Sequence, residues 1–219
     1  MRDAEEIRCV VLGGGGHGAV IIDILIASKA VVPIAVVDRD SALWGTTVLD
    51  VPVIGGDEKL ADLAENGATS FVIGVGSTGK ATPRQRLFKL ALKAGLQAQT
   101  LCHPTAFVSK LAQLGQGAVV AAMAAVNTRA TVGANVIINT GAIVEHDCVL
   151  GDHVHIATGA KLAGGVVVGD SAHIGAGAIV KEGIYIGADA IVGAGAVVIR
   201  DVAPKTTVVG VPAALLKKR

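Results

Sequence analysis

Residues 132–150 read VGANVIINTGAIVEHDCVL, and an aliphatic residue returns at every sixth position of this stretch. The sixteen positions of the period, from Val108 to Val198 in steps of six, are all Val, Ile or Leu. Four residues after each of them stands another apolar and mostly small residue, such as Ala142. A period of six fits neither an α-helix nor simple strand alternation. It predicts short strands joined by corners, with both apolar positions facing inward.

Three such hexapeptides close one triangular coil, so the repeat has an 18-residue turn. Residues 108–203 then make a little over five coils, and stacking at about 4.8 Å per coil gives a prism roughly 25 Å tall. The core of this prism contains no large rings, since only 2% of the chain is aromatic. Glycine often follows the aliphatic position, as at Gly133 and Gly151, where it serves a tight corner.

The composition excludes several functions. Lys+Arg is 19 and Asp+Glu is 18, so the formal net charge is +1 and no strong field is available to gather nucleic acid or an anionic membrane. The scarcity of aromatic residues also argues against a stacking platform for single-stranded nucleic acid. We therefore expect no nucleic-acid partner.

The mean hydropathy of +0.61 would suit a membrane protein. The longest uncharged run, between Lys110 and Arg129, is however interrupted by Gln113, Gln116 and Asn127. It lacks the roughly 20 apolar residues of a membrane-spanning helix, so we expect no membrane insertion. The first six residues include Arg2, Asp3, Glu5 and Glu6. Acidic residues there argue against a signal peptide.

The cysteines are odd in number and widely spaced, at Cys9, Cys102 and Cys148. They form neither a disulfide framework nor a zinc knuckle. Together with the N-terminus, they indicate a reduced protein of the cytoplasm.

The N-terminal third carries a glycine fingerprint. Residues 9–12 form a short buried-strand pattern, residues 13–18 read GGGGHG, and a helical run follows over 19–30. A second strand over 33–37 ends at Asp38, 20 residues beyond Gly18. This spacing is typical of a tight turn whose backbone N–H groups and helix N-terminus face a phosphate. A third strand is expected over 70–75, followed by a helix with Arg84 and Arg86.

The length of this region limits its ligand. Only about 100 residues precede the repeat, too few for the two half-folds that grip a dinucleotide. A half-Rossmann unit holds one nucleotide diphosphate instead. The sequence therefore predicts an α/β Rossmann-like βαβ unit over residues 1–103 and a parallel β-helix over residues 104–219.

The two regions together carry a family resemblance. The hexapeptides and the ending VGVPA at 209–213 resemble the hexapeptide-repeat acyltransferases. A Gly-His-Gly Rossmann-like unit before such a prism is similar to the bacterial nucleotide-sugar acetyltransferases of the sialic-acid O-acetyltransferase-like family. The most specific stretch is NTGAIVEHDC at 139–148, continuing through His155 to Gly164. The resemblance covers essentially the whole chain and implies a left-handed β-helix and a homotrimer with sites between prisms.

The resemblance also implies chemistry. His146 becomes the general base, and Asp147 holds its far ring nitrogen, although many family members have Glu there. Asn139, His155 and the backbone N–H of Gly164 match positions that bind acetyl-CoA, the expected co-substrate. The closest members acetylate the 4-amino group of nucleotide-linked 4-amino-4,6-dideoxy sugars, such as GDP-perosamine or UDP-linked precursors of bacillosamine. We expect the nucleotide-linked sugar to bind Gly15, His17, Gly18, Asp38, Arg39, Gly76 and Ser77.

Three alternatives stay open. The acceptor can be a sugar hydroxyl, because His146 would serve an O-acetyltransferase equally well. The chain can be a non-catalytic nucleotide-sensing or assembly module. A zinc-dependent carbonic anhydrase would use imidazoles among His146, His153, His155 and His173, but their spacings do not resemble that family, so we expect no metal. Cys148 is not expected to be a nucleophile, because its repeat position faces inward.

Overall fold

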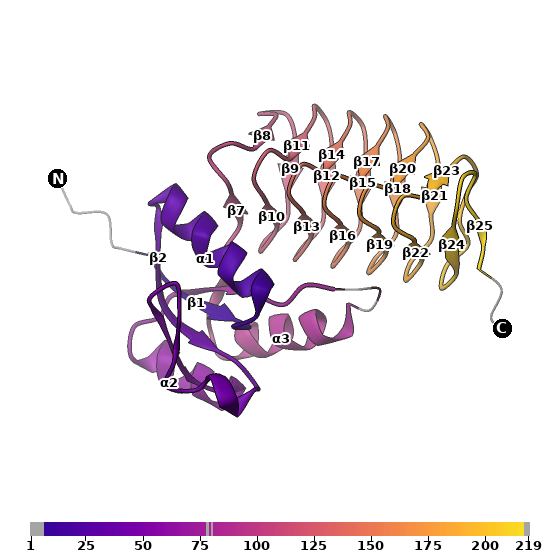
Figure 1. Ribbon diagram of the computed structural model, residues 1–219. Coiled ribbons are helices and arrows are strands. Elements are labelled where there is room, and N and C mark those ends of the chain that lie inside the picture. The colour runs from indigo at the N-terminus through magenta and orange to yellow at the C-terminus, as the bar shows by residue number, and fades with distance from the viewer. Residues whose placement is uncertain (1–6, 78, 80, 217–219) are drawn as a thin grey trace. The chain divides into compact units, whose positions relative to one another are not determined.

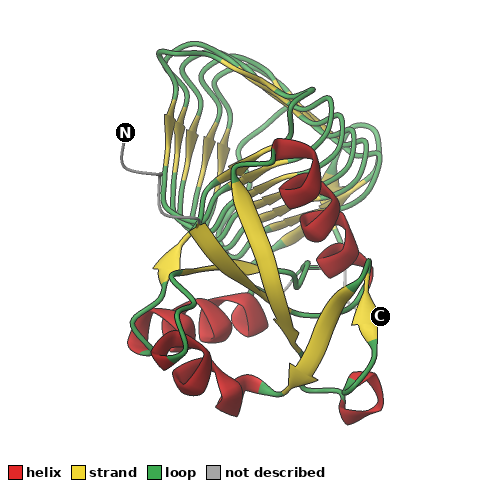
Figure 2. Cartoon of the chain, turned by 90° about the vertical axis from the view of Figure 1, so that its left-hand side faces the viewer, coloured by secondary structure: helices red, strands yellow, loops and turns green. Residues whose placement is uncertain are grey.

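The computed structural model describes residues 7–77, 79 and 81–216. They belong to two compact units, which we describe separately: Met1–Gly76 with Thr82–Gln99, and Ser77–Ala81 with Thr100–Arg219. The acidic N-terminal residues and the basic residues 217–219 lie outside the described residues. Figures 1 and 2 show the chain coloured by residue number and by secondary structure.

The first unit is a twisted sheet with helices. In spatial order its strands are β3 (Thr47–Val48), β4 (Val51–Gly55), β2 (Val31–Val37), β1 (Ile7–Leu12), β5 (Ser70–Ile73) and β6 (Gln97–Ala98). The helices are α1 (Gly16–Ser28), α2 (Leu60–Glu65) and α3 (Thr82–Lys93), with 3₁₀ turns η1 (Ser41–Leu43) and η2 (Asp57–Lys59). All neighbouring strands pair in parallel except β3, which is antiparallel to β4.

The predicted βαβ elements are confirmed, with shifted ends. The helix begins at Gly16 rather than residue 19, because Gly15 already serves as its N-cap. Lys29 caps the C-terminus of the helix. It has a left-handed conformation, with φ 56°, and its backbone N–H donates to the Leu25 carbonyl. The third strand stops at Ile73, two residues early. The β3–β4 hairpin and α2 were not predicted from the sequence.

The second unit is a triangular prism of three parallel sheets. Its first sheet contains β7 (Leu101–Cys102), β10 (Val119–Val120), β13 (Ile137–Ile138), β16 (His155–Ile156), β19 (His173–Ile174), β22 (Ile191–Val192), β24 (Thr207–Val209) and the antiparallel β25 (Ala214–Leu215). The second contains β8 (Phe107–Val108), β11 (Ala125–Val126), β14 (Ile143–Val144), β17 (Lys161–Leu162), β20 (Ile179–Val180) and β23 (Val197–Val198). The third contains β9 (Gln113–Leu114), β12 (Thr131–Val132), β15 (Val149–Leu150), β18 (Val167–Val168) and β21 (Tyr185–Ile186).

The 18-residue turn is confirmed by the strand register. Val120 pairs with Ile138, and Ile138 pairs with Ile156. The prism's first strand, β7, lies just before residue 104, where the second region was predicted to begin. The segment Ser77–Ala81 also belongs to this unit, although it lies far earlier in the sequence.

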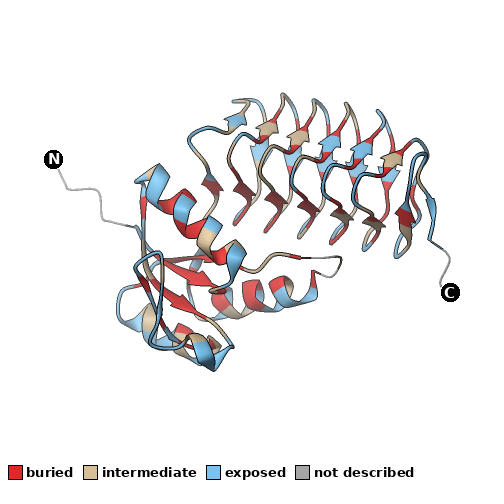
Figure 3. Ribbon diagram, in the orientation of Figure 1, coloured by how far each residue is buried: buried red, intermediate tan, exposed pale blue. Residues whose placement is uncertain are grey.

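The inward positions form one continuous apolar cluster. Both the aliphatic series and the small series line it, and its members are all Ala, Val, Ile, Leu or Cys. This ring-free core was predicted from the hexapeptide pattern. Buried residues occupy both positions of β10, β13 and β16, shown in red in Figure 3.

Residues 18 apart occupy the same corner in successive coils. One column of corner residues contains Thr128, His146 and Gly164, and the next contains Arg129, Asp147 and Gly165. Arg129 and Asp147 are left-handed, with φ 59° and 62°. The Asp147 N–H donates to the Thr128 carbonyl, and this bond fixes one coil on the next. No helix among the described residues has the length and hydropathy needed to cross a membrane.

Candidate active site

A cavity of about 680 Å³ lies at the carboxyl ends of the central strands of the first unit. Strands β1, β2 and β5 end there at Leu12, Val37 and Ile73. β1 pairs with β2 on one side and β5 on the other, so the chain order switches direction at this edge, where open parallel sheets bind ligands. The volume is within the usual range for a small-molecule site.

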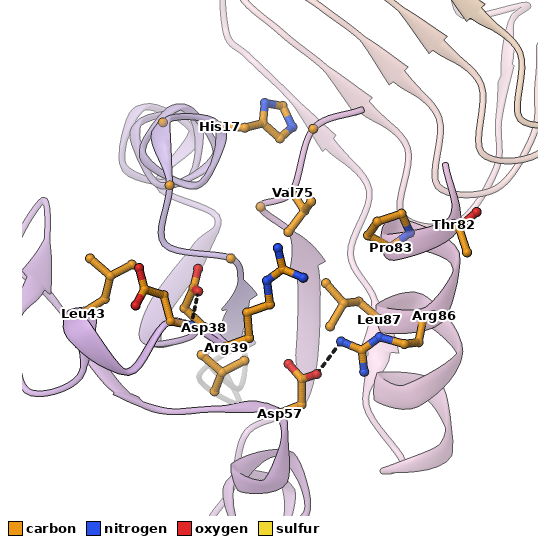
Figure 4. A pocket seen from close by; sticks show the side chains of 17 residues that line it. His17, Asp38, Arg39, Leu43, Asp57, Val75, Thr82, Pro83, Arg86 and Leu87 are labelled. Carbon is orange, nitrogen blue, oxygen red and sulfur yellow. Dashed lines mark hydrogen bonds and ion pairs between the residues drawn. The ribbon is translucent and has the colours of Figure 1, made fainter. Parts of the chain in front are cut away.

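Five of the seven predicted nucleotide-sugar residues line this cavity. They are Gly15, His17, Asp38, Arg39 and Gly76. Figure 4 shows Arg39 extending into the cavity between Asp38 and the pair formed by Asp57 and Arg86. Arg86 Nη2 lies 2.6 Å from Asp57 Oδ2. These two residues and Thr82 also line the cavity, although they were not among the site residues predicted from the sequence.

Asp38 organises the glycine loop. Its Oδ2 accepts the Gly14 N–H at 2.6 Å, and its Oδ1 accepts the Asp40 N–H at 2.8 Å. Its backbone carbonyl accepts Trp44 Nε1–H at 2.8 Å. The carboxylate therefore holds the loop in shape at the cavity wall.

The glycines of the fingerprint have different tasks. A Cβ on Gly18 would overlap the Gly13 carbonyl oxygen, so Gly18 permits the close packing of α1 on the loop and does not line the cavity. A Cβ on Gly15 would meet no atom of the described residues within 4 Å. The open space at Gly15 lies beside the first turn of α1, whose N–H groups and dipole attract a phosphate.

His17 is held neutral. Burial, followed by the charge of Arg84, lowers the pKa of His17 to about 4. Its Nε2 is buried and has no hydrogen-bond partner among the described residues. Arg84 is 1% exposed, and burial lowers its pKa to about 10, so it stays charged at neutral pH. The first unit thus combines a buried guanidinium with a neutral imidazole beside its cavity.

The prism carries the predicted His146–Asp147 pair. His146 Nδ1 lies 2.7 Å from Asp147 Oδ2, and since a carboxylate only accepts, Nδ1 carries the proton. The His146 side chain is 56% exposed. Asp147 also accepts Arg129 Nε at 2.6 Å and Nη2 at 2.8 Å. Hydrogen bonds from Arg129 and then from His146 hold the pKa of Asp147 well below its usual range.

The His146 imidazole lies against Gly164 on the next coil of the prism. A Cβ on Gly164 would lie 2.6 Å from both Cε1 and Nε2 of His146. The ring therefore occupies space that is open only because residue 164 is glycine. This gives Gly164 a structural task beside the backbone contact with acetyl-CoA that the resemblance implied.

A second polar cluster joins Asn139, His155 and Ser77. His155 Nδ1 donates to the Ser77 carbonyl at 2.9 Å, and its Nε2 lies 3.3 Å from Asn139 Nδ2. The Asn139 amide is oriented because its Oδ1 accepts the Thr140 N–H at 2.8 Å. His155 is 6% and Ser77 7% exposed. The structure thus places Ser77 on the prism rather than in the nucleotide cavity, and His155, which the resemblance matched to acetyl-CoA binding, is buried.

Comparison with known proteins identifies the family. The PglD N-terminal domain model matches residues 8–89, and the bacterial transferase hexapeptide model matches residues 129–164 and 165–200. A solved structure of a GDP-perosamine N-acetyltransferase variant from Caulobacter crescentus is 42% identical, with a TM-score of 0.90. It covers 96% of this chain and 97% of its own. The chain belongs to the hexapeptide-repeat nucleotide-sugar acetyltransferases.

Two further solved structures are similar to this chain. The acetyltransferase domain of PglB from Neisseria gonorrhoeae, solved with acetyl coenzyme A, is 34% identical, with a TM-score of 0.88 over 96% of this chain and 100% of its own. WeeI from Acinetobacter baumannii is 28% identical, with a TM-score of 0.82 over 95% and 99%. No curated protein sequence matches. The prism is the left-handed β-helix that the resemblance implied.

The prism of this acetyltransferase also contains His153, His173 and Cys148. His153 and His173 are half-buried: Asn135 Nδ2 lies 3.0 Å from His153 Nδ1, and His173 packs edge-on against His155. Cys148 is fully buried, and burial raises the pKa of its thiol. Among the described residues no three His, Cys, Asp or Glu side chains converge as metal ligands.

Sequence reasoning missed Arg129 and Asp57. Asp57 lies in a 3₁₀ turn that the periodicity did not reveal. Arg129 had a usable signal, since it stands 18 residues before Asp147, and the repeat brings residues at that separation together.

Proposed function

We propose that the chain transfers the acetyl group of acetyl-CoA to the 4-amino group of a nucleotide-linked 4-amino-4,6-dideoxyhexose. The observation that carries the proposal is the exposed His146, with Nδ1 fixed on Asp147 and Nε2 left for a substrate. Similar proteins bind the matching ligands, since the Caulobacter structure holds CoA and GDP-perosamine and the Neisseria structure holds acetyl-CoA.

The reaction would proceed by direct attack. The amine nitrogen forms a bond to the thioester carbonyl carbon, and His146 Nε2 takes a proton from that nitrogen. The tetrahedral intermediate then collapses, the carbon–sulfur bond breaks, and the imidazolium returns the proton to the departing CoA thiolate. Asp147 stabilises the imidazolium that forms between these steps. The buried Cys148 supports this route over an acetyl-enzyme.

The two units would divide the binding. We assign the nucleotide to residues 1–103, where Gly15, the first turn of α1 and Arg39 suit a diphosphate. We assign acetyl-CoA to residues 104–219, at Asn139 and the backbone N–H of Gly164. His155 would act through Asn139, because its own ring is buried.

The proposed assembly is a homotrimer. Within one chain, β14 separates the corner that holds Asn139 from the corner that holds His146. A neighbouring prism is therefore needed to bring the two corners to one cleft. Both substrates belong to the cytoplasm, where we place the enzyme.

The decisive experiment is a substrate panel. UDP-, GDP- and dTDP-linked 4-amino sugars are each mixed with acetyl-CoA, and thiol release is followed. The proposal expects rapid release with one nucleotide, and release that stops when the 4-amino group is replaced by hydroxyl. Faster release with the hydroxyl sugar would establish the O-acetyltransferase instead, and no release with any sugar would refute an acetyltransferase.

A further inference from the structure

The Arg129 guanidinium is the outermost member of a line of three side chains. It donates two hydrogen bonds to Asp147, from Nε at 2.6 Å and from Nη2 at 2.8 Å. Asp147 Oδ2 then accepts His146 Nδ1–H at 2.7 Å. A two-point contact between a planar guanidinium and a carboxylate fixes the plane of the carboxylate as well as its position.

The geometry of the corner explains why such a clamp is useful here. Asp147 is 42% exposed, and water competes for its oxygens. No described side chain other than Arg129 and His146 bonds to its carboxylate. Without Arg129 the short side chain could rotate and leave the imidazole unsupported.

We propose that Arg129 is a positioning residue of the acetyl-transfer site: it clamps Asp147 from the preceding coil so that Asp147 holds Nδ1 of His146 and leaves Nε2 for the amine. The inference rests on the proposed role of His146. Arg129 itself touches no reacting atom and acts only through Asp147.

Stability does not account for the contact. Arg129 is 63% exposed, and exposed ion pairs add little to folding stability. Arg129 also has φ 59°, an unfavourable conformation for a residue with a side chain. The corners at Gly165 and Gly183, one and two coils beyond Asp147, have glycine instead. The arginine therefore occupies a strained corner where a glycine would suit the backbone better.

The test is a double-mutant cycle on the full chain. It compares kcat and KM for wild type, Arg129→Ala, Asp147→Asn and the double variant. Since the clamp acts through Asp147, Arg129→Ala should lower kcat about 10-fold in wild type but by less than about 2-fold in the Asp147→Asn background. KM for both substrates should change little. Arg129→Lys, which keeps the charge without the two-point geometry, should give an intermediate kcat.

Lys205→Ala is the matched control, because Lys205 is an exposed cation at a left-handed corner with φ 58°. It should leave kcat unchanged. Unaltered kcat in Arg129→Ala, or an equal loss in both backgrounds, overturns the inference while His146 can still be the base. Full kcat in His146→Asn overturns both the role of His146 and the clamp. Thermal melting of each variant separates misfolding from these results, and Arg129→Lys repeats the comparison if Arg129→Ala is unstable.

Discussion

The imidazole of His146 rests where a side chain on Gly164 would stand, one coil further along the prism. A Cβ there would lie 2.6 Å from two ring atoms. Gly164→Ala should therefore displace the ring rather than the fold, because the exposed His146 side chain can rotate away. We expect kcat to fall roughly 10- to 100-fold, since a displacement of about 1 Å has this scale of effect, with little change in melting temperature.

Gly177→Ala is the control for that substitution. Gly177 has φ +67° and open space around its Cβ, so alanine there adds backbone strain without touching His146. It should lower stability and spare kcat. Wild-type kcat in Gly164→Ala would show that the position of the ring has no catalytic importance.

His146→Asn tests the base itself. Asparagine is polar and of similar size but cannot accept a proton at neutral pH. Both substrates should still bind, and kcat should fall by about 10²–10⁴-fold. Steady-state kinetics with saturating substrates measure this directly. Retention of most of the kcat would assign proton transfer to water or to another group.

Gly15→Val separates the two binding sites. The open space at Gly15 lets the first unit fold with valine, while the side chain would crowd a phosphate at the α1 N-terminus. Affinity for the nucleoside diphosphate should fall at least about tenfold. Trp44 is the only tryptophan of the chain and donates to the Asp38 carbonyl, so its fluorescence reports the binding. Acetyl-CoA affinity is the internal control, and equal weakening of both ligands would contradict separate sites.

His17 should make the first unit sensitive to acid. Its pKa is about 4 in the folded protein and near 6.5 when unfolded, so the unfolded state binds more protons between these values. Stability is therefore full above pH 6.5 and is lost as pH falls towards 4, by up to roughly 3 kcal/mol. Urea unfolding followed by Trp44 fluorescence should show this slope, and His17→Asn should flatten it. His103→Asn, in the second unit, serves as the control. An unchanged slope in His17→Asn would count against the neutral imidazole at His17.

The trimer can be tested by complementation. The His146→Asn and Asn139→Ala variants are unfolded, mixed with each other and refolded together. If Asn139 of one copy serves His146 of its neighbour, about a quarter of the sites in randomly mixed trimers should be intact. Recovery of activity above either variant alone, with a trimer in sedimentation, is the expected result. A fully active monomer would rule the arrangement out.

The prism was predictable because its period is rigid. Every sixth residue faces inward, so the positions of His146 and Asp147 at one corner followed from counting. The positions of Asp57 in the first unit and of Ser77 in the second were harder to predict, because the turns and crossings that place them have no sequence period. Burial of His155 depends on Ser77, which is 78 residues away in sequence, and no local pattern reveals such a contact.

Arg129, the pair His146–Asp147 and Gly164 lie on three successive coils of the prism. Their alignment depends on sequence spacing, because Arg129 stands 18 residues before Asp147 and His146 stands 18 residues before Gly164. Deleting one residue between Arg129 and Asp147 would turn every later side chain one place around the prism, and Cys148 would replace Asp147 beside the guanidinium. Adding a whole 18-residue coil elsewhere would lengthen the prism and leave the three in line. Sequence length within this window is thus as constrained as the identity of the residues.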